Sequence, residues 1–183
     1  MPSLTPDQIR KLACFKAYDV RGKIPTELNE SIAFKIGHAV TEYLQASAIV
    51  IGYDIRHSSP ELVQSVSRGI IQAGAEVINI GLCGTEEVYF ATNFFGSDGG
   101  IMVTASHNPA DYNGMKIVGN EARPISMDSG LKEIKQLAEQ LVTTVDDKSL
   151  SLTHKSFRPD YIKKILSFID VEQLKSLKVL NPC

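Results

Sequence analysis

Segments with apolar residues at helical spacing alternate along the chain with short, continuous apolar runs. Apolar positions four residues apart predict an amphipathic helix within 28–44 and a second helix from Ser59, where a capping serine precedes a proline and an acid. Gly74 is suited to end that second helix. Further helices are expected in "TEEVYFATNFF", with Thr85 as its cap, and in "SMDSGLKEIKQLAEQL".

Short apolar runs lie between these helices and predict strands. They are "SAIVIGYD", "EVINIG", "GGIMVTAS" and a returning "GMKIVG". Strands that alternate with helices of about ten to fifteen residues predict an α/β fold with a layered sheet. Ligands of such folds bind in the loops after the strands, which directs attention to "GYDIRHSSP" and "TASHNP".

The pattern changes near residue 142. Residues 142–156 are polar and without periodicity, which predicts a linker. After it we expect a short helix in "RPDYIKKILSFID", a helical turn in "VEQLKS" and an apolar run, "LKVLNPC". We therefore divide the chain into a first domain, 1–141, and a second part, 142–183.

Composition narrows the class of partner. The 183 residues are 43% hydrophobic with a net charge of -2, and no basic block argues for nucleic acid or anionic lipid. No apolar run approaches the roughly 20 residues that a membrane-spanning helix needs. The three cysteines lie far apart without metal-ligand spacing, and the first residues lack a signal-peptide core. These features predict a cytoplasmic protein with a small-molecule partner.

The loop "TASHNPADYNGMKIV" (104–118) concentrates reactive side chains after a buried strand. Ser106 is free to present its hydroxyl there, and Pro109 prevents a helix. Asn113-Gly114 predicts a turn, after which Lys116 returns a positive charge. From these residues alone, an ordinary polar turn and a phosphate or nucleophile site are equally supported.

The sequence does not support a serine-hydrolase site or a nucleotide-binding site. Adjacent side chains of extended backbone point apart, so the neighbours Ser106 and His107 do not predict a catalytic dyad. A serine hydrolase is disfavoured because no G-x-S-x-G elbow occurs, and nucleotide binding because no Walker or G-x-G-x-x-G sequence occurs.

Four segments together carry a resemblance to a known family. "FKAYDVRG" (15–22), "IGYDIRHSS" (51–59), "GTEEVYFA" (84–91) and "TASHNPADYNGMKIV" occur in that order. The chain from Leu12 to Pro182 resembles the α-D-phosphohexomutases, most closely the bacterial phosphomannomutase and phosphoglucomutase branch. The likeness is strongest to the members that supply mannose 1-phosphate for GDP-mannose. It implies a three-layer α/β/α sandwich with a mostly parallel, mixed sheet.

The resemblance also implies a reaction. Members interconvert hexose 6-phosphates and 1-phosphates through a phosphoserine, which corresponds to Ser106. A hexose 1,6-bisphosphate is the intermediate and activator, and Mg²⁺ contacts an oxygen of the serine phosphate. Phosphoryl transfer of this kind depends on positioning and charge neutralisation.

The matching positions give each residue an expected role. Lys116 would neutralise charge or assist proton transfer, and His107 would either do the same or only hydrogen-bond the loop. Asn108 would order the loop at the substrate. Tyr18 and Arg21 would lie near substrate and phosphoserine, where an arginine fork suits phosphate oxygens.

Other polar residues have simpler interpretations. A salt bridge between Arg21 and Asp19 is the structural alternative to a phosphate contact. Asp54 and Arg56 are expected to pin the loop rather than to touch substrate. His38 is expected to be a packed or surface histidine.

The sequence departs from the family pattern in extent. The family has four domains, and its aspartate-rich metal loop, sugar-recognition loop and distal phosphate loop have no counterpart here. We therefore expect a first domain with the start of a second, unable to complete a mutase cycle alone. A non-catalytic binding module of the same fold is the alternative. Apolar surface and self-association or disorder are expected after about Lys155.

Overall fold

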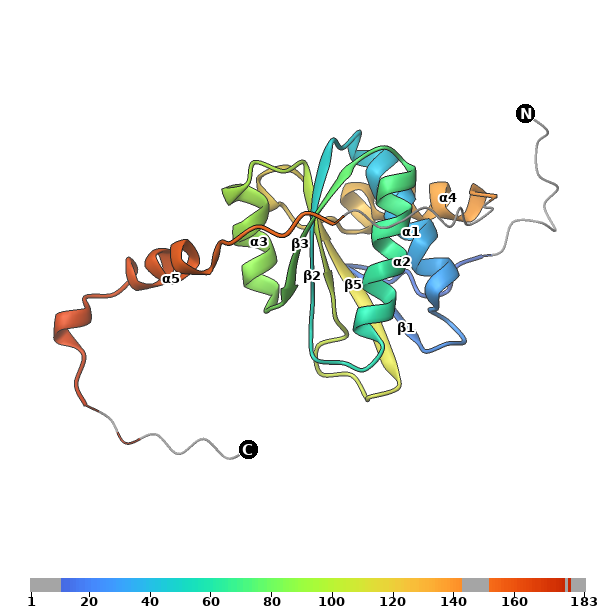
Figure 1. The fold of residues 1–183 in the computed structure, drawn as a ribbon. Coiled ribbons are helices and arrows are strands. Elements are labelled where there is room, and N and C mark those ends of the chain that lie inside the picture. Colours follow the sequence, from blue (N-terminus) through green and yellow to red (C-terminus); the bar gives the residue numbers. More distant parts are fainter. Residues whose placement is uncertain (1–10, 143–151, 177, 179–183) are drawn as a thin grey trace.

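The computed structural model describes residues 11–142, 152–176 and 178. Its strands are β1 (Val20–Lys23), β2 (Ala48–Tyr53), β3 (Glu76–Leu82), β4 (Gly99–Val103) and β5 (Tyr112–Val118). Its α-helices are α1 (Glu30–Leu44), α2 (Ser59–Gln72), α3 (Thr85–Phe94), α4 (Lys132–Gln140) and α5 (Arg158–Leu166). The helices and strands alternate as the apolar pattern predicts (Figure 1).

The five strands form one mixed sheet in the order β1-β5-β4-β2-β3. Strand β2 is parallel to β3 and β4, whereas β5 is antiparallel to both β4 and β1. Four of the five strands therefore share one direction, which confirms the mostly parallel, mixed sheet. The apolar pattern does not predict β1, because this edge strand is four residues long and only half of them are buried.

Helices cover both faces of the sheet, so the three-layer α/β/α sandwich is confirmed. Helices α1, α2 and α4 lie on one side and α3 on the other (Figure 1). The larger apolar core lies under the first three helices and includes Ile36, Ile70 and Ile134. The smaller core lies under α3 and includes Val88 and Met102. Helix α3 packs mainly against β2 and β4, which leaves the β5 and β1 edge of its face without a helical cover.

The first residues of two helices differ from the prediction. Helix α2 has Ser58 at its cap position, and the hydroxyl of Ser59 instead donates to Asp54 Oδ1 at 2.7 Å. Helix α3 is capped at Gly84, whose N–H donates to Glu87 Oε2 at 2.7 Å, so Thr85 is not the cap. In the first case the Ser59 hydroxyl bonds to Asp54, five residues earlier, and does not cap the helix.

Two glycines set helix boundaries. Gly74, at φ 98°, follows the end of α2, as predicted. Gly130, at φ 130°, interrupts the helix expected over 126–141, so α4 begins only at Lys132. A Cβ at Gly130 would lie 2.2 Å from the Tyr43 hydroxyl oxygen, so the position requires glycine for space as well as for conformation.

The segment before α5 is attached to the sheet edge. Thr153 pairs with β3: its N–H donates to Val77 O at 3.1 Å, and its carbonyl accepts from Asn79 N at 3.0 Å. This part of the expected linker is therefore bound to the first domain. The rest of it, 143–151, and most of "LKVLNPC" lie outside the described residues, and the domain division stays a prediction.

Helix α5 is anchored on one side and exposed on the other. Phe157 is buried in the smaller core, and the ring of Tyr161 lies 5.4 Å from that of Phe90. The expected apolar surface after Lys155 is present and comprises exposed Ile162, Ile165, Leu166, Phe168, Ile169, Val171 and Leu174. Self-association through it stays a prediction. No helix in the described part of the chain has the length and apolarity to cross a membrane.

Candidate functional site

The candidate site is the loop that joins β4 to β5. It leaves the sheet at the carboxyl end of the central strand β4, where ligands of α/β folds bind. The N–H of Thr104 donates to Gly114 O at 3.0 Å, which extends the ladder beyond the last residue of β4. A turn closes the loop where Tyr112 N donates to Pro109 O at 3.0 Å. The loop is therefore short and closed at its base.

The expected turn at Asn113-Gly114 is wrong, because both residues lie within β5. The buried Asn113 amide donates to the hydroxyls of Ser58 and Ser59, at 2.9 and 3.0 Å. A Cβ at Gly114 would lie 2.1 Å from Val20 O, so glycine permits the close approach of β1. Tertiary contacts here outweigh the local turn preference.

Ser106 has a left-handed backbone, with φ 51°. This conformation is unfavourable for a residue other than glycine and is found at sites where surrounding contacts impose it. It turns the serine hydroxyl towards the next residue, and Ser106 Oγ lies 2.8 Å from His107 Nδ1. The expectation that these side chains diverge is therefore wrong, because it assumed an extended backbone. Both residues are exposed.

Arg56, in the segment that follows the neighbouring strand β2, fixes the loop. Its guanidinium donates to four main-chain carbonyls: Ser106 O (2.8 Å), Asn108 O (2.6 Å), Pro109 O (2.8 Å) and Tyr112 O (3.0 Å). Its Nε lies 3.4 Å from Asp54 Oδ2, and the side chain is only 13% exposed. A planar fork with five donors can meet this many acceptors at once. The prediction that Arg56 pins the loop is confirmed.

Asp54 anchors the base of the loop. It accepts from Arg56 N at 3.0 Å and, as described above, from the Ser59 hydroxyl. Its second oxygen accepts from Thr104 Oγ1 at 2.7 Å, and that same hydroxyl oxygen accepts from Ser106 N at 2.9 Å. The pinning role of Asp54 is thus also confirmed. Sequence reasoning missed Thr104, although a hydroxyl two residues before the candidate serine was a usable signal.

Asn108 orders the loop from within. Its side-chain amide donates to Ala105 O at 3.0 Å, and its backbone N–H donates to the same carbonyl at 3.1 Å. The amide is thereby committed to the loop itself. The loop-ordering role expected of Asn108 has a geometric basis, whereas its contact with substrate stays a prediction.

Two cations gather on the face of the sheet that α3 leaves open. Met115 and Val20, which face each other in the β5–β1 ladder, both point into the larger core, so Arg21 and Lys116 project from the opposite face. Asp19 Oδ2 lies 2.6 Å from Arg21 Nη2 and 3.9 Å from Lys116 Nζ. The salt bridge between Arg21 and Asp19 is therefore formed, and it holds the two cations around one carboxylate.

Tyr18 stands beside this group and is 79% exposed. Arg21 Nε is buried and has no hydrogen-bond partner among the described residues. Their contacts with phosphate or sugar stay predictions. His38 is a half-buried residue of α1, and its Nδ1 lies 3.5 Å from Glu42 Oε2, so the expectation of a packed or surface histidine is confirmed.

Other nucleophiles and metal ligands in the described part of the chain are less suited to chemistry. Burial raises the pKa of the Cys14 thiol to about 11 and that of Cys83 to about 12, so both are protonated at neutral pH. Among the described residues, no group of three or more His, Cys, Asp or Glu side chains could hold a metal ion. Ser106 thus stands out as the accessible nucleophile of the site.

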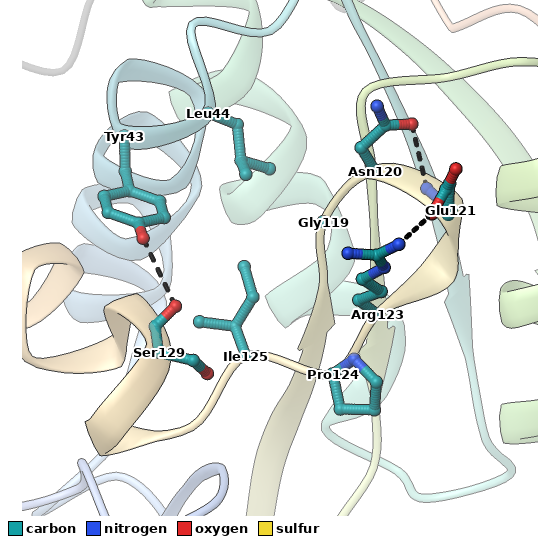
Figure 2. A pocket seen from close by; sticks show the side chains of 9 residues that line it. All are labelled: Tyr43, Leu44, Gly119, Asn120, Glu121, Arg123, Pro124, Ile125 and Ser129. Atoms are coloured by element: carbon teal, nitrogen blue, oxygen red, sulfur yellow. Dashed lines mark hydrogen bonds and ion pairs between the residues drawn. The ribbon is translucent and has the colours of Figure 1, made fainter.

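A cavity of about 480 Å³ lies at the other end of the sheet (Figure 2). Its lining includes Tyr43, Leu44, Ile125 and, after β5, Gly119, Asn120, Glu121 and Arg123. Gly119 follows the end of β5 that pairs with the start of β4, whereas the Ser106 loop follows the end of β4. No residue of the predicted site lines this cavity, so it is distinct from the candidate site.

The chain is similar to known proteins over most of its length. The family model for phosphoglucomutase/phosphomannomutase, alpha/beta/alpha domain I, matches residues 13–144. A phosphomannomutase from Salmonella montevideo is 48% identical over 174 residues, which are 94% of this chain and 38% of that protein. A phosphomannomutase from Klebsiella pneumoniae is 55% identical over 130 residues, 71% of this chain and 83% of that protein.

A solved structure of a phosphoglucomutase/phosphomannomutase family protein from Burkholderia thailandensis superposes with a TM-score of 0.69. It is 31% identical, and the match covers 84% of this chain and 35% of that one. The match thus covers little more than a third of the Salmonella and Burkholderia proteins, but most of the Klebsiella protein. With the family model matching most of the described fold, the chain belongs to the phosphoglucomutase/phosphomannomutase family and contains its α/β/α domain I.

Proposed function

We propose that this chain is the phosphoserine-bearing part of a phosphohexomutase that interconverts mannose 6-phosphate and mannose 1-phosphate, and also the glucose phosphates. The observation that carries the proposal is Ser106: an exposed hydroxyl, held in an unfavourable conformation by Arg56 from the loop after β2 and by Thr104 at the base of its own loop. Such strain is retained where the surrounding structure is selected to impose it. The curated relatives named phosphomannomutase support the choice of substrate.

In the proposed reaction, phosphorylated Ser106 gives its phosphoryl group to the free hydroxyl of a hexose 6-phosphate. The bond from Oγ to phosphorus breaks, a bond from the sugar oxygen to phosphorus forms, and hexose 1,6-bisphosphate results. The bisphosphate then gives its 6-phosphoryl group to Ser106, and hexose 1-phosphate leaves. The reverse sequence regenerates the 6-phosphate.

The neighbouring side chains have separate proposed parts. His107 Nδ1, 2.8 Å from Ser106 Oγ, holds the hydroxyl proton when the serine is unphosphorylated. Lys116 and Arg21 neutralise phosphate charge, and Lys116 exchanges a proton with the sugar hydroxyl. Tyr18 and Asn108 contact the substrate at the rim of the loop.

Mg²⁺ would neutralise charge on the transferring phosphate. This chain would supply one ligand, a phosphate oxygen on Ser106. The described residues offer no cluster of three or more further ligands, so we infer that the ion needs residues from elsewhere in the full-length enzyme. No step proposed for this chain depends on such a cluster.

Incorporation of labelled phosphate tests the proposal. The chain is incubated with hexose 1,6-bisphosphate labelled with ³²P, with Mg²⁺, and the label bound to protein is counted. We expect incorporation that the Ser106→Ala variant abolishes. Ser126→Ala is a control, because that serine lies on an exposed turn away from the loop. Label retained in Ser106→Ala would overturn the assignment.

A coupled mutase assay separates the phosphoserine part from the complete enzyme. We expect no steady-state turnover of mannose 1-phosphate or glucose 1-phosphate by this chain, because positioning a sugar phosphate requires contacts at both of its ends. Turnover would mean that these residues suffice for the cycle. Absence of both turnover and labelling would favour a non-catalytic binding module.

The contact between Ser106 and His107 also favours a second candidate, a serine hydrolase. A hydrolase additionally needs an acid to orient the histidine. Among the described residues, no carboxylate forms a hydrogen bond or ion pair with His107, so we rank this candidate below the mutase. Hydrolysis of a generic ester that Ser106→Ala abolishes would reverse the ranking.

The surroundings proposed for the protein follow from its surface. We propose hexose phosphates as partners, without nucleic acid or membrane, from the net charge of -2 and the lack of a basic block, and a cytoplasmic location stays part of this proposal. We also propose that the apolar surface on and after α5 promotes self-association.

A further inference from the structure

We propose that Thr104 is a positioning residue for Ser106. Its hydroxyl, which is hydrogen-bonded to Asp54, holds Ser106 in the left-handed conformation, and this conformation presents Ser106 Oγ to His107. The inference rests on the proposed function, because it concerns the efficiency of the same serine.

The hydroxyl of Thr104 is both a hydrogen-bond donor and a hydrogen-bond acceptor. It donates to Asp54 Oδ2 at 2.7 Å, so its lone pairs are free to face the loop, and it accepts from Ser106 N at 2.9 Å. A hydroxyl that donates to a carboxylate becomes a better acceptor, because hydrogen bonds in a chain polarise one another. Thr104 is only 6% exposed, so water cannot easily replace it as the partner of Ser106 N.

The position of this contact explains why it controls Ser106. The bond fixes the N–H of Ser106, and Arg56 fixes the carbonyl of the same residue at 2.8 Å. The peptide groups before and after Ser106 are therefore each held by a side chain, so the φ and ψ angles of Ser106 have little freedom. Loss of either contact would let Ser106 relax towards a more favourable φ, which moves Oγ away from His107 Nδ1.

Thr104 and Arg56 differ in what else they support. Arg56 contacts four loop carbonyls, so removing it disturbs the whole loop. The Thr104 hydroxyl touches the loop only through Ser106 N, among the hydrogen bonds of the described residues. Thr104 is therefore the residue at which the conformation of Ser106 can be tested with little other change.

Substitutions of nearly constant volume provide the test. Thr104→Val removes the hydroxyl and keeps the branched shape, whereas Thr104→Ser keeps the hydroxyl. Thr92→Val is the matched control: Thr92 is fully buried, and its hydroxyl donates to Val88 O at 2.8 Å within α3, away from the loop. Each valine variant thus loses one buried hydroxyl.

Two readouts are taken on the 183-residue chain. The first is the rate of ³²P incorporation from hexose 1,6-bisphosphate. We expect a fall of about 10- to 100-fold in Thr104→Val, the range that the loss of one buried hydrogen bond gives. We expect near-native rates in Thr104→Ser and Thr92→Val.

The second readout is NMR spectroscopy of Ser106, from its amide exchange rate and the scalar coupling that reports φ. In Thr104→Val we expect faster amide exchange and loss of the left-handed coupling signature, while Thr104→Ser retains both. This readout requires no phosphoryl transfer. If the wild-type chain takes up no label, the proposed function fails, and the NMR result still decides the role of Thr104.

A native Ser106 coupling in Thr104→Val would overturn the inference. Equal slowing of labelling in Thr92→Val and Thr104→Val would also overturn it, because a general loss of stability would then explain the effect. Failure of Thr104→Ser to restore the rate would show that the hydroxyl is not the group responsible.

Discussion

Two turns at opposite ends of the sheet contain non-glycine residues with left-handed backbone, and they are supported differently. At the end of β4, Ser106 (φ 51°) is held by Arg56, Thr104 and, through Thr104, Asp54. After β5, Glu121 and Ala122 have φ angles of 57° and 54°, and Glu121 lines the cavity of Figure 2.

The bonds around the second turn are local and exposed. Asn120 Oδ1 accepts from Glu121 N at 2.9 Å, and Arg123 pairs with Glu121 while its side chain is 80% exposed (Figure 2). By contrast, the contact from Arg56 to Ser106 spans 50 residues of sequence and lies on a side chain that is 13% exposed. The two strained turns therefore differ in their support: a distant, shielded side chain holds Ser106, whereas only local, exposed contacts hold the far turn, and the first arrangement is the one expected of a functional site.

The largest expected difference between the turns is in stability. Arg56→Ala removes four bonds and leaves Asp54 without its cation, so we expect the free energy of unfolding to fall by about 2–4 kcal/mol. Arg123→Ala should change it by no more than about 0.5 kcal/mol, because an exposed ion pair contributes little. Urea unfolding of both variants measures this, and equal losses would remove the distinction between the turns.

Glycine substitution separates strain from function at each turn. Ala122→Gly and Ser106→Gly each relieve a left-handed residue, so we expect a gain of about 0.5–1 kcal/mol in the free energy of unfolding. Only Ser106→Gly should lose phosphate incorporation. If Ala122→Gly also abolished labelling, the far turn would be coupled to the site, contrary to this account.

Self-association should depend on the second part of the chain and on neither turn. Light scattering after gel filtration should show a concentration-dependent rise in mass that the pair of substitutions Ile165→Ser and Phe168→Ser reduces, because both side chains are exposed and apolar. Glu121→Gln should leave the mass unchanged. A monomer at all concentrations would contradict the proposal.

The last expected difference between the turns is in local opening. Ser106 N bonds to a buried hydroxyl and Glu121 N to an exposed side chain. We therefore expect the Ser106 amide to exchange at least about tenfold more slowly than that of Glu121, because its opening breaks a shielded bond. Native-state hydrogen exchange followed by NMR measures both rates, and a reversed order would contradict the comparison.

The sequence predicts the scaffold better than the loop for identifiable reasons. Helix α1 and strand β2 follow from long apolar stripes, and the pinning roles of Asp54 and Arg56 follow from their place after a strand. Strand β1 is too short to leave a periodic signal. Asn113-Gly114 is a local turn signal that contacts with α2 and β1 override.

Ser106 shows the limit most clearly. Its place at the end of a strand is readable, but its left-handed φ depends on Arg56 and Asp54, which the loop after β2 brings to it. The contact with His107 follows from that φ, so no pattern of neighbouring residues predicts it. The place of Thr104 two residues before Ser106 is a usable signal, but its bond to Asp54 depends on a side chain 50 residues away in the sequence.

The most direct test of the account is the location of phosphate in the chain as isolated from cells. Peptide mapping by mass spectrometry compares the peptide containing Ser106 with the one containing Ser126 and Ser129, which lies by the far turn. The account predicts phosphate on Ser106 alone of these three serines, with higher occupancy after treatment with hexose 1,6-bisphosphate. An unmodified Ser106 before and after that treatment, or equal modification of both peptides, would contradict it.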